Sequence, residues 1–373
     1  MPGPAVEVRE ISMQYDASAR VLDRVSLAVG EGERLCLLGP SGSGKTTLLQ
    51  LIAGFLTPSE GSIQIAGRDQ THVPASRRNL GIVFQNLALF PHMSVADNVA
   101  YGLKARRADK AMTRQKVTEA LDMVGLSGFA HRRPRQLSGG QQQRVAFARA
   151  IAFDPAALLL DEPFSSLDTA LRKTIRAELM RLQEEVQVPT ILVTHDQEEA
   201  LAFGHKLAVI NRGRVEQFGT PEELYESPQT RFTAQFLGGA NFIPGAVVAA
   251  AEGTADVSLL GATARSVALP TPGTTVSTGT TVEVLVRPDR VGVMPRGTAT
   301  RGCVLPGTVV RSTYLGETVE FHIQVGEGSV TAKVPGASGI GGGALIDVVL
   351  PEGGLRLFPA GRDGAPVAEE VPA

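Results

Sequence analysis

Short runs of apolar residues alternate with longer amphipathic stretches through the first two thirds of the chain. The runs at residues 34–38, 81–84, 157–160, 190–194 and 207–210 predict buried strands. Between two of them, apolar side chains recur every three or four residues, at Leu171, Ile175, Leu179, Leu182 and Val186. That spacing predicts a helix with one apolar stripe, and Pro189 would end it before the next strand. Strands that alternate with helices indicate an α/β domain with a parallel sheet.

The pattern changes near residue 240. Beyond it, short apolar runs at residues 281–286, 308–310, 319–325 and 346–350 are separated by Gly, Pro and Ser. This spacing is typical of a small β-domain with tight turns. We therefore predict one domain at residues 1–238 and a second at residues 239–360. Residues 361–373 are rich in Pro, Ala and Glu and are expected to form a disordered tail.

Composition and charge exclude several classes of protein. The 373 residues carry 36 basic and 38 acidic side chains, a net charge of −2, so no global positive field favours nucleic acid. The apolar runs are far shorter than the ~20 residues of a membrane-spanning helix. The first residues lack the basic and apolar segments of a signal peptide. Two distant cysteines, Cys36 and Cys303, cannot form a disulfide scaffold and fit a reducing cytosol. Membrane association would therefore go through a partner.

A glycine-rich loop carries the first chemical signal. Residues 39–46 match G-x-x-x-x-G-K-[ST] at every fixed position, between a predicted strand and a predicted helix at residues 46–53. Glycines let backbone N–H groups surround anionic oxygens, and the helix N-terminus adds its positive dipole end. Lys45 is expected to reach the β- and γ-phosphates of ATP, and the Thr46 hydroxyl to ligate Mg²⁺. The residues expected to bind the nucleotide here are Gly39, Pro40, Ser41, Gly42, Ser43, Gly44, Lys45, Thr46 and Thr47.

Two adjacent carboxylates end another predicted strand. Asp161 and Glu162 follow the apolar run at 157–160. Ligands of open α/β folds bind at the carboxyl ends of the strands. Asp161 is therefore expected to serve Mg²⁺, through water, and Glu162 to orient and deprotonate the attacking water. Exposed acids at a strand end are usually only solvated, but the phosphate loop favours the functional interpretation.

A second glycine motif identifies a family. Residues 137–144 read Leu137-Ser138-Gly139-Gly140-Gln141-Gln142-Gln143-Arg144 and open a predicted helix at 141–151, a second N-terminus that could bind an anion. This octapeptide resembles the signature of ATP-binding-cassette (ABC) ATPases. In that family two cassettes pair head to tail, and the signature of one closes over the ATP bound by the other. The resemblance implies a homodimer in which Ser138, Gly139, Gly140 and Gln141 contact the nucleotide of the partner.

Further positions match functional residues of the family. Gln85 resembles the glutamine that senses the γ-phosphate and Mg²⁺, and His195 resembles the switch histidine. Asp168, in residues 165–168, resembles the aspartate of the loop that crosses the dimer interface. Tyr15 resembles the aromatic residue that stacks on adenine, the alternative being a packing role. The resemblance thus implies a catalytic set of Glu162, His195, Gln85 and Lys45, and a metal set of Thr46, Gln85 and Asp161.

Other segments resemble the importer subclass of the family. Residues 85–95 and 194–200 are similar to its ATPases, while residues 241–245, 286–289, 307–310 and 314–316 resemble the appended transport-associated OB-like barrel. The implied architecture is an α/β P-loop ABC nucleotide-binding domain followed by an all-β OB-like barrel with a regulatory or dimer-stabilising role. The implied partners are two integral membrane permease subunits and, indirectly, a periplasmic or surface solute-binding protein. The implied location is peripheral, on the cytoplasmic face of the bacterial inner membrane.

The segment at residues 85–101 is the expected contact with the permease. Phe90, Pro91 and Met93 are expected to be exposed there, and a buried loop is the alternative.

The transported solute rests on a weaker resemblance. Residues 69–75 look most like spermidine/putrescine import ATPases, whereas importers of ferric iron, phosphonate, sulfate and sugar share almost the same motifs. A soluble ABC ATPase of DNA repair or translation is another class, but such proteins usually carry a long insertion or two cassettes. A regulatory module without hydrolysis is disfavoured by the intact Lys45, Asp161, Glu162 and His195. An exporter is disfavoured because no transmembrane segment is fused to the cassette.

Overall fold

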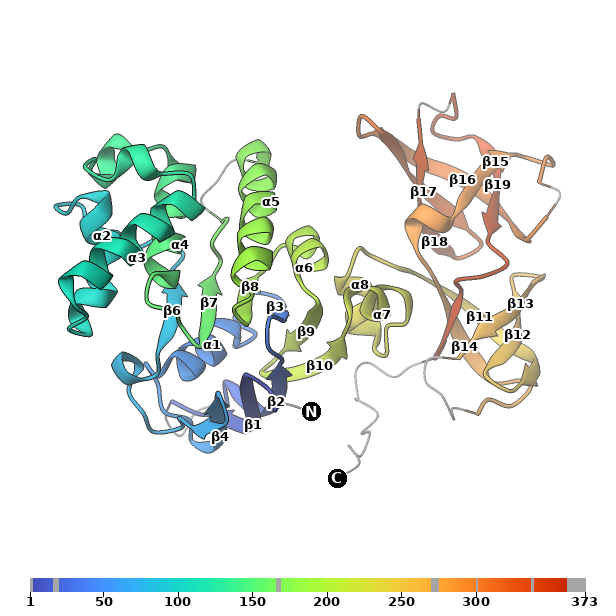
Figure 1. Cartoon of the computed structure of the whole chain (residues 1–373). Coiled ribbons are helices and arrows are strands. Elements are labelled where there is room, and N and C mark those ends of the chain that lie inside the picture. Colours follow the sequence, from blue (N-terminus) through green and yellow to red (C-terminus); the bar gives the residue numbers. More distant parts are fainter. Residues whose placement is uncertain are drawn as a thin grey trace. The chain divides into compact units, whose positions relative to one another are not determined.

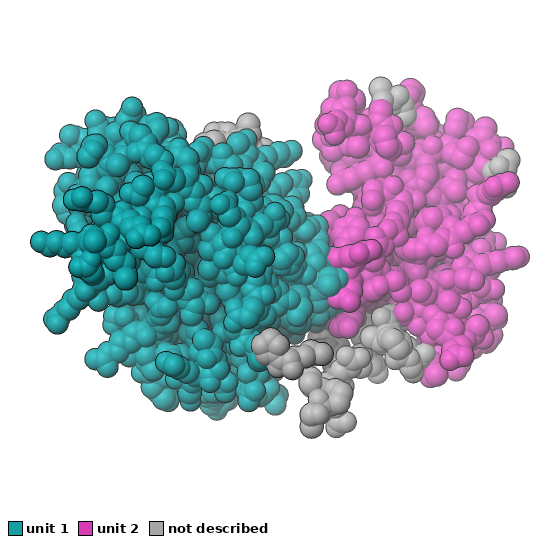
Figure 2. Space-filling model, viewed as in Figure 1, with its two compact units in different colours: residues 1–221 teal, residues 222–373 magenta. Residues whose placement is uncertain are grey.

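The computed structural model divides into two compact units, residues 1–221 and 222–373 (Figures 1 and 2). It describes residues 3–15, 20–165, 169–269, 275–299, 301–336 and 339–360. The expected tail at 361–373 lies outside these residues. None of the helices in the described ranges is long and apolar enough to cross a membrane.

The first unit is built on a six-stranded sheet with the order β10-β9-β3-β8-β7-β6. Five strands are parallel, and β10 pairs antiparallel with β9 at one edge. Every residue of β3 and β8 is buried, as expected for a parallel sheet covered on both faces. The strands are β3 (Arg34–Leu38), β6 (Leu80–Val83), β7 (Ala157–Asp161), β8 (Thr190–Thr194), β9 (Lys206–Asn211) and β10 (Arg214–Gly219). The α/β prediction and its five buried strands are confirmed.

Helices cover this sheet. Helix α1 (Lys45–Ala53) packs against β7 and β8, and α6 (Gln197–Phe203) packs against β3 and β8. The predicted stripe lies on α5 (Thr169–Val186), where Ile175, Leu179 and Leu182 are buried. A separate group consists of α2 (Val95–Ala105), α3 (Lys110–Met123) and α4 (Gly139–Ile151), which contact one another (Figure 1). Short 3₁₀ turns lie at η1 (Ala75–Arg77), η2 (Ser127–Phe129) and η3 (Pro134–Gln136).

A second, antiparallel sheet completes this unit, with the order β2-β1-β4-β5. Its strands are β1 (Val6–Met13), β2 (Leu22–Val29), β4 (Glu60–Ile65) and β5 (Arg68–Asp69). Their buried side chains form one apolar cluster with those of α1, β3 and β8. The phosphate-loop helix is therefore enclosed between two sheets.

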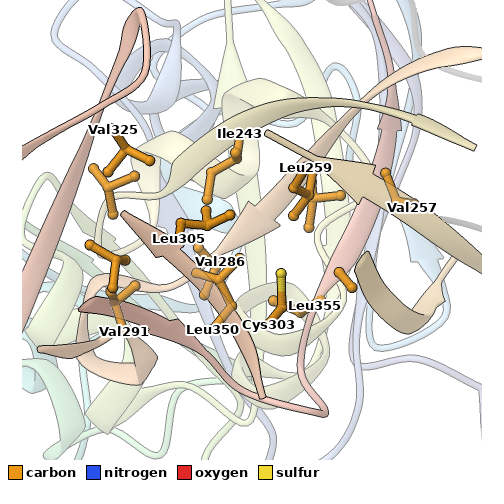
Figure 3. Close-up of a cluster of buried hydrophobic side chains, with 14 of the residues drawn as sticks. Ile243, Val257, Leu259, Val286, Val291, Cys303, Leu305, Val325, Leu350 and Leu355 are labelled. Atoms are coloured by element: carbon orange, nitrogen blue, oxygen red, sulfur yellow. The ribbon is translucent and has the colours of Figure 1, made fainter. Parts of the chain in front are cut away.

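The second unit is all-β apart from short helices. A closed barrel with the order β11-β12-β13-β20-β14 is joined in sequence to a five-stranded sheet with the order β15-β19-β16-β17-β18. One apolar cluster fills both, and includes Ile243, Val286, Leu305 and Leu350 (Figure 3). The elements are α7 (Pro221–Glu226), α8 (Arg231–Phe236), β11 (Asn241–Ala251), β12 (Thr254–Leu259), β13 (Ala262–Ala268), β14 (Thr281–Val286), η4 (Pro288–Arg290), β15 (Gly292–Pro295), β16 (Cys303–Tyr314), β17 (Thr318–Val325), β18 (Gly328–Pro335), β19 (Leu345–Leu350) and β20 (Arg356–Pro359).

The units divide after residue 221, at the start of α7, whereas the boundary was expected after residue 238. One reason is Arg287, whose buried guanidinium donates hydrogen bonds to four backbone carbonyls of the preceding segment. Nη1 lies 2.6 Å from the oxygens of Ala234 and Leu237 and 2.7 Å from that of Gly239. Nη2 lies 2.6 Å from the oxygen of Tyr225. These bonds attach α7 and α8 to the barrel.

Candidate active site

Four neighbouring strands deliver the expected site residues to one sheet edge. In the order β3-β8-β7-β6, the strands are followed by the phosphate loop, His195, Glu162 and Gln85, with Asp161 as the last residue of β7. Because these strands are parallel, all their carboxyl ends meet at the same edge. The topology thus gathers segments that are far apart in the sequence.

The phosphate loop is a backbone cradle that only glycine can form. Gly44 has φ +104°, a conformation that side chains rarely adopt. A Cβ at Gly39 would lie 2.1 Å from the carbonyl oxygen of Ile210. The buried Lys45 donates from Nζ to the carbonyl oxygens of Gly39 and Pro40, both at 2.9 Å. The Ser43 hydroxyl is buried without a hydrogen-bond partner. A polyphosphate fits this cradle because it would accept from both the ammonium and the loop.

Negative charge is concentrated next to Lys45. Burial, together with the charge of Glu162, raises the pKa of Asp161, while the Lys45 ammonium opposes that rise. Burial lowers the pKa of Lys45, and the two carboxylates oppose the shift. Crowded carboxylates of this kind favour a divalent cation with oxygen ligands. The exposed Thr46 hydroxyl can supply one more oxygen, so the residues present fit Mg²⁺. Within the described ranges no cluster of three or more His, Cys, Asp or Glu could hold a metal, so phosphate oxygens and water would complete the shell.

Glu162 is contacted from two other strand ends. Its Oε1 lies 3.2 Å from Nδ1 of His195, and its Oε2 accepts from Nε2 of Gln85 at 3.3 Å. Its backbone has φ +43°, which is uncommon for a residue with a side chain. The structure therefore brings Glu162, His195 and Gln85 within hydrogen-bonding distance, next to the phosphate loop. A carboxylate in this position can accept a proton from a water molecule, and the imidazole can orient the carboxylate.

Ser165 begins the motif at residues 165–168, but its contact with the catalytic candidates was not expected from the sequence. Its hydroxyl accepts from Nε2 of Gln85 at 3.2 Å and donates to the backbone oxygen of Glu162 at 3.0 Å. Gln143 makes a comparable link, because its Nε2 donates to the oxygen of Pro163 at 2.7 Å. Gln143 lies on the buried face of α4, five residues after the N-cap. A buried amide needs a hydrogen-bond partner, and this need is the signal that could have indicated the contact from the sequence.

The signature residues form the start of α4. The Ser138 hydroxyl accepts from the backbone N–H of Gln141 at 3.3 Å, and the Gln141 side chain accepts from the N–H of Ser138 at 3.0 Å. This capping box fixes an exposed helix N-terminus. Among the described residues, no hydrogen bond or ion pair joins residues 138–141 to the phosphate loop. Gly139 is exposed and Gly140 is buried.

Three further residues were expected to contact the nucleotide, and the structure describes two of them. Tyr15 lies after β1 with 53% of its surface exposed, and Thr47 is half-buried in α1. Asp168 lies outside the described residues.

The loop that was expected to contact a permease is only partly exposed. Pro91 is exposed, but Phe90 and Met93 are half-buried. The Phe90 ring packs against Tyr101, with ring centroids 4.4 Å apart. The side chain of Asn98 bonds both the N–H and the C=O of Phe90, at 2.8 and 3.1 Å. Residues of α2 thus fold the loop back onto the helix.

Comparison with known families matches both units. A family model described as "ABC transporter" matches residues 22–165, and one described as "TOBE domain" matches residues 284–358. A third, described as "AAA domain, putative AbiEii toxin, Type IV TA system", matches residues 129–202.

The names of two similar proteins describe them as ATP-binding proteins of import systems. The chain is 46% identical over 327 residues to "Spermidine/putrescine import ATP-binding protein PotA" of Marinobacter nauticus, covering 87% of this chain and 85% of the relative. It is 56% identical over 223 residues to "Sulfate/thiosulfate import ATP-binding protein CysA 2" of Chromobacterium violaceum, covering 60% of this chain and 61% of the relative. Among solved structures, the dimeric post-hydrolysis state of the ATP-binding cassette MJ0796 with ADP and Pi matches with a TM-score of 0.51 and 34% identity. That match covers 58% of this chain and 98% of the solved one.

Proposed function

Because this chain belongs to the ATP-hydrolysing import subunits of ABC transporters, we propose that it binds MgATP at the described sheet edge and drives the uptake of polyamines. The observation that carries the ATP site is the meeting of four strand ends there. They bring a phosphate loop, a pair of carboxylates, a glutamine and a histidine to one place.

Each group has a defined part in hydrolysis. Lys45 and the loop amides bind the phosphates and stabilise their charge. Glu162 takes the proton of the attacking water, and His195 and Gln85 orient the reacting groups around it. Mg²⁺, held by Thr46, Asp161 and Gln85, would supply further charge neutralisation. Tyr15, which is largely exposed, is free to stack on the adenine ring.

We further propose that the active form is a head-to-tail homodimer. The exposed N-terminus of α4 is separate from the phosphate loop of its own chain, so a second copy can bring it to the γ-phosphate. Gly139, Gly140 and Gln141 would face the nucleotide with Ser138. The related cassette crystallised with ADP and Pi is dimeric, which supports this arrangement.

Docking on two permease subunits is proposed for the helical group. A groove of ≈ 820 Å³ lies between α2 and α3, with Ala100, Val117 and Leu121 as apolar lining and Lys104 and Asp122 as charged lining. A hollow of ≈ 470 Å³ next to it is lined in part by His92, Met93 and Tyr101, the loop expected to contact the permease. A mixed apolar and charged groove of this size suits a short amphipathic helix. A permease helix here would place the chain peripherally on the cytoplasmic face of the inner membrane, with the solute-binding protein as an indirect partner.

Polyamine is the proposed solute because the relative named for spermidine and putrescine matches over 327 residues at 46% identity, whereas one named for the import of Fe(3+) ions matches over 309 residues at 43%. The sulfate relative is more identical but over a shorter part of the chain. The proposal is tested by uptake of radiolabelled spermidine and sulfate in a strain that lacks this gene. The gene for the wild-type chain or for Lys45→Ala is then returned on a plasmid.

We expect the wild type, but not Lys45→Ala, to restore spermidine uptake and to leave sulfate uptake unchanged. Restoration of sulfate uptake alone would show that the solute is sulfate and not a polyamine, and it would leave the proposed import function unchanged. Uptake restored equally by Lys45→Ala would contradict the role of the phosphate loop.

A further inference from the structure

The peptide that carries His195 is anchored on both sides by buried or half-buried polar groups. Before it, the Thr194 hydroxyl accepts from the backbone N–H of Asp196 at 3.0 Å. After it, the Asp196 carboxylate accepts from the backbone N–H of Glu199 at 3.1 Å and caps α6. The imidazole itself is more than half exposed, and within the described residues Glu162 is the one side chain that forms an ion pair or hydrogen bond with it. The direction of the ring therefore depends on the peptide that carries it and on Glu162.

Glu199 connects these anchors. Its carboxylate, with 5% of the side chain exposed, accepts from the Thr194 hydroxyl at 2.6 Å. Its other oxygen lies 3.7 Å from Nε of Arg172, whose Nη1 also donates to Asp196 at 3.1 Å. One carboxylate thus joins the end of β8, the first turn of α6 and a side chain of α5. A buried hydrogen-bonded carboxylate of this kind gives a local structure a single geometry.

The adjacent glutamate offers a natural contrast. Glu198 lies in the same first turn of α6 but is exposed, whereas Glu199 is 3% exposed. The two residues have the same charge and size and lie in the same turn of the helix. They differ in whether the side chain reaches the peptide around His195.

We propose that Glu199 is a positioning residue that fixes the direction of the His195 imidazole toward the γ-phosphate and Glu162. The proposal rests on the role assigned to His195 in the proposed function. Loss of the Glu199 carboxylate releases the Thr194 hydroxyl, and the imidazole then samples directions that no longer meet the nucleotide. Because the link acts on orientation, it affects the hydrolytic step more than the binding of ATP.

The test compares Glu199→Ala, Glu199→Gln and Thr194→Val with the control Glu198→Ala, all in the full chain. Hydrolysis is measured as kcat and KM, and nucleotide affinity is measured separately with a fluorescent ATP analogue in EDTA. A misplacement of ~1 Å can lower a rate ~10²-fold, so we expect kcat to fall about ten- to hundredfold in Glu199→Ala. Affinity should change less than about threefold, because the phosphate loop is untouched. Glu199→Gln keeps the size and an acceptor for Thr194 and should recover most of the rate.

A second measurement does not depend on hydrolysis. The ¹⁵N–¹H spectrum of the imidazoles in the nucleotide-free chain reports the contact of His195 Nδ1 with Glu162, after assignment with His195→Ala. We expect the His195 signals to shift in Glu199→Ala and in Thr194→Val, and to stay in place in Glu198→Ala. Unchanged signals together with unchanged kcat would overturn the proposal, as would an equal effect of Glu198→Ala.

The variant His195→Ala distinguishes a failure of the Glu199 proposal from a failure of the role that the proposed function gives to His195. If His195→Ala hydrolyses ATP at the wild-type rate, the role of His195 in the proposed function is wrong. If His195→Ala is inactive while the Glu199 variants match the control, that role stands and the positioning role of Glu199 is wrong.

Discussion

Both carboxylate oxygens of Glu162 contact other side chains. His195 contacts one oxygen and Gln85 the other, while Ser165 links Gln85 back to the Glu162 backbone. The proposed catalytic groups are therefore in contact with one another.

Replacement of Glu162 by Gln separates binding from hydrolysis. The amide keeps the size of the carboxylate but cannot take a proton, so we expect hydrolysis to fall by ~10²–10⁴-fold. ATP should then remain bound between two chains. Gel filtration with MgATP should show a dimer for Glu162→Gln and mainly monomer for the wild type.

The matched variant is Lys45→Ala, which should lose ATP binding and hydrolysis together and remain monomeric. A Glu162→Gln chain that binds ATP yet elutes as a monomer would contradict the head-to-tail dimer. Wild-type hydrolysis by that variant would contradict the assignment of Glu162 as the base.

Asp161 should reduce the stability of the nucleotide-free protein at neutral pH. Burial raises its pKa, so the folded chain binds this proton more tightly than the unfolded chain. The free energy of unfolding must therefore fall as pH rises from the unfolded pKa of Asp to the higher folded value. We expect Asp161→Asn to unfold at higher urea than the wild type at pH 7. The difference should shrink toward pH 4.5, and a difference that grows in that direction would contradict the sign.

At the scale of elements, a buried guanidinium helps to attach α7 and α8 to the second unit. Arg287 is 2% exposed and lies over the ring of Tyr225, 4.2 Å from its centroid, in addition to its four carbonyl bonds. The last carbonyls of a helix have no partners within the helix. Arg287, which directly follows β14, supplies hydrogen-bond donors to such carbonyls.

Replacement of Arg287 by Met should destabilise the second unit strongly. The apolar chain leaves four carbonyls without a donor, and each unsatisfied buried group costs ~1–3 kcal/mol, so we expect a loss of about 3 kcal/mol or more. Arg290→Met is the control, because Arg290 forms a partly exposed pair with Glu226, a kind worth ~0–1 kcal/mol. Calorimetry of the full chain measures both. Equal melting of the two variants would show that the carbonyl bonds contribute little.

Contiguous patterns were predictable from sequence, and contacts between distant segments were not. Strands β3, β8 and β14 have the bounds that their apolar runs predict. In β3 and β8 every residue is buried, so each strand is a continuous apolar run in the sequence. The link of Gln85 to Ser165 spans 80 positions, and it depends on the strand order. The burial of Phe90 depends on Asn98, an amide that any exposed helix could carry.

At the scale of the whole molecule, nucleotide binding should need only the first unit. The phosphate loop, the carboxylates and His195 all precede residue 221. A chain ending at residue 221 should therefore bind a fluorescent ATP analogue within about threefold of the full chain, since no binding contact is lost. Loss of binding by a folded fragment would contradict the division.

The end of that fragment matters for solubility. Ala234 and Leu237 are fully buried, and Arg287 bonds their carbonyl oxygens. A chain ending at residue 237 carries these apolar groups without the barrel that covers them, so it should scatter more light than the chain ending at 221. Equal solubility would indicate that α8 is stable without the barrel.

Each unit contains one cysteine, so the rate of thiol labelling can report the opening of each unit in the unmodified protein. Cys36 lies on β3 and Cys303 on β16, with 0% and 7% of their surfaces exposed, and burial raises the pKa of both thiols. Only an exposed thiolate reacts quickly with a disulfide reagent. Each cysteine is therefore labelled only when its own unit opens. The labelling rates, resolved by mass spectrometry, time the opening of the nucleotide unit and of the barrel separately, and ATP should slow only the labelling of Cys36.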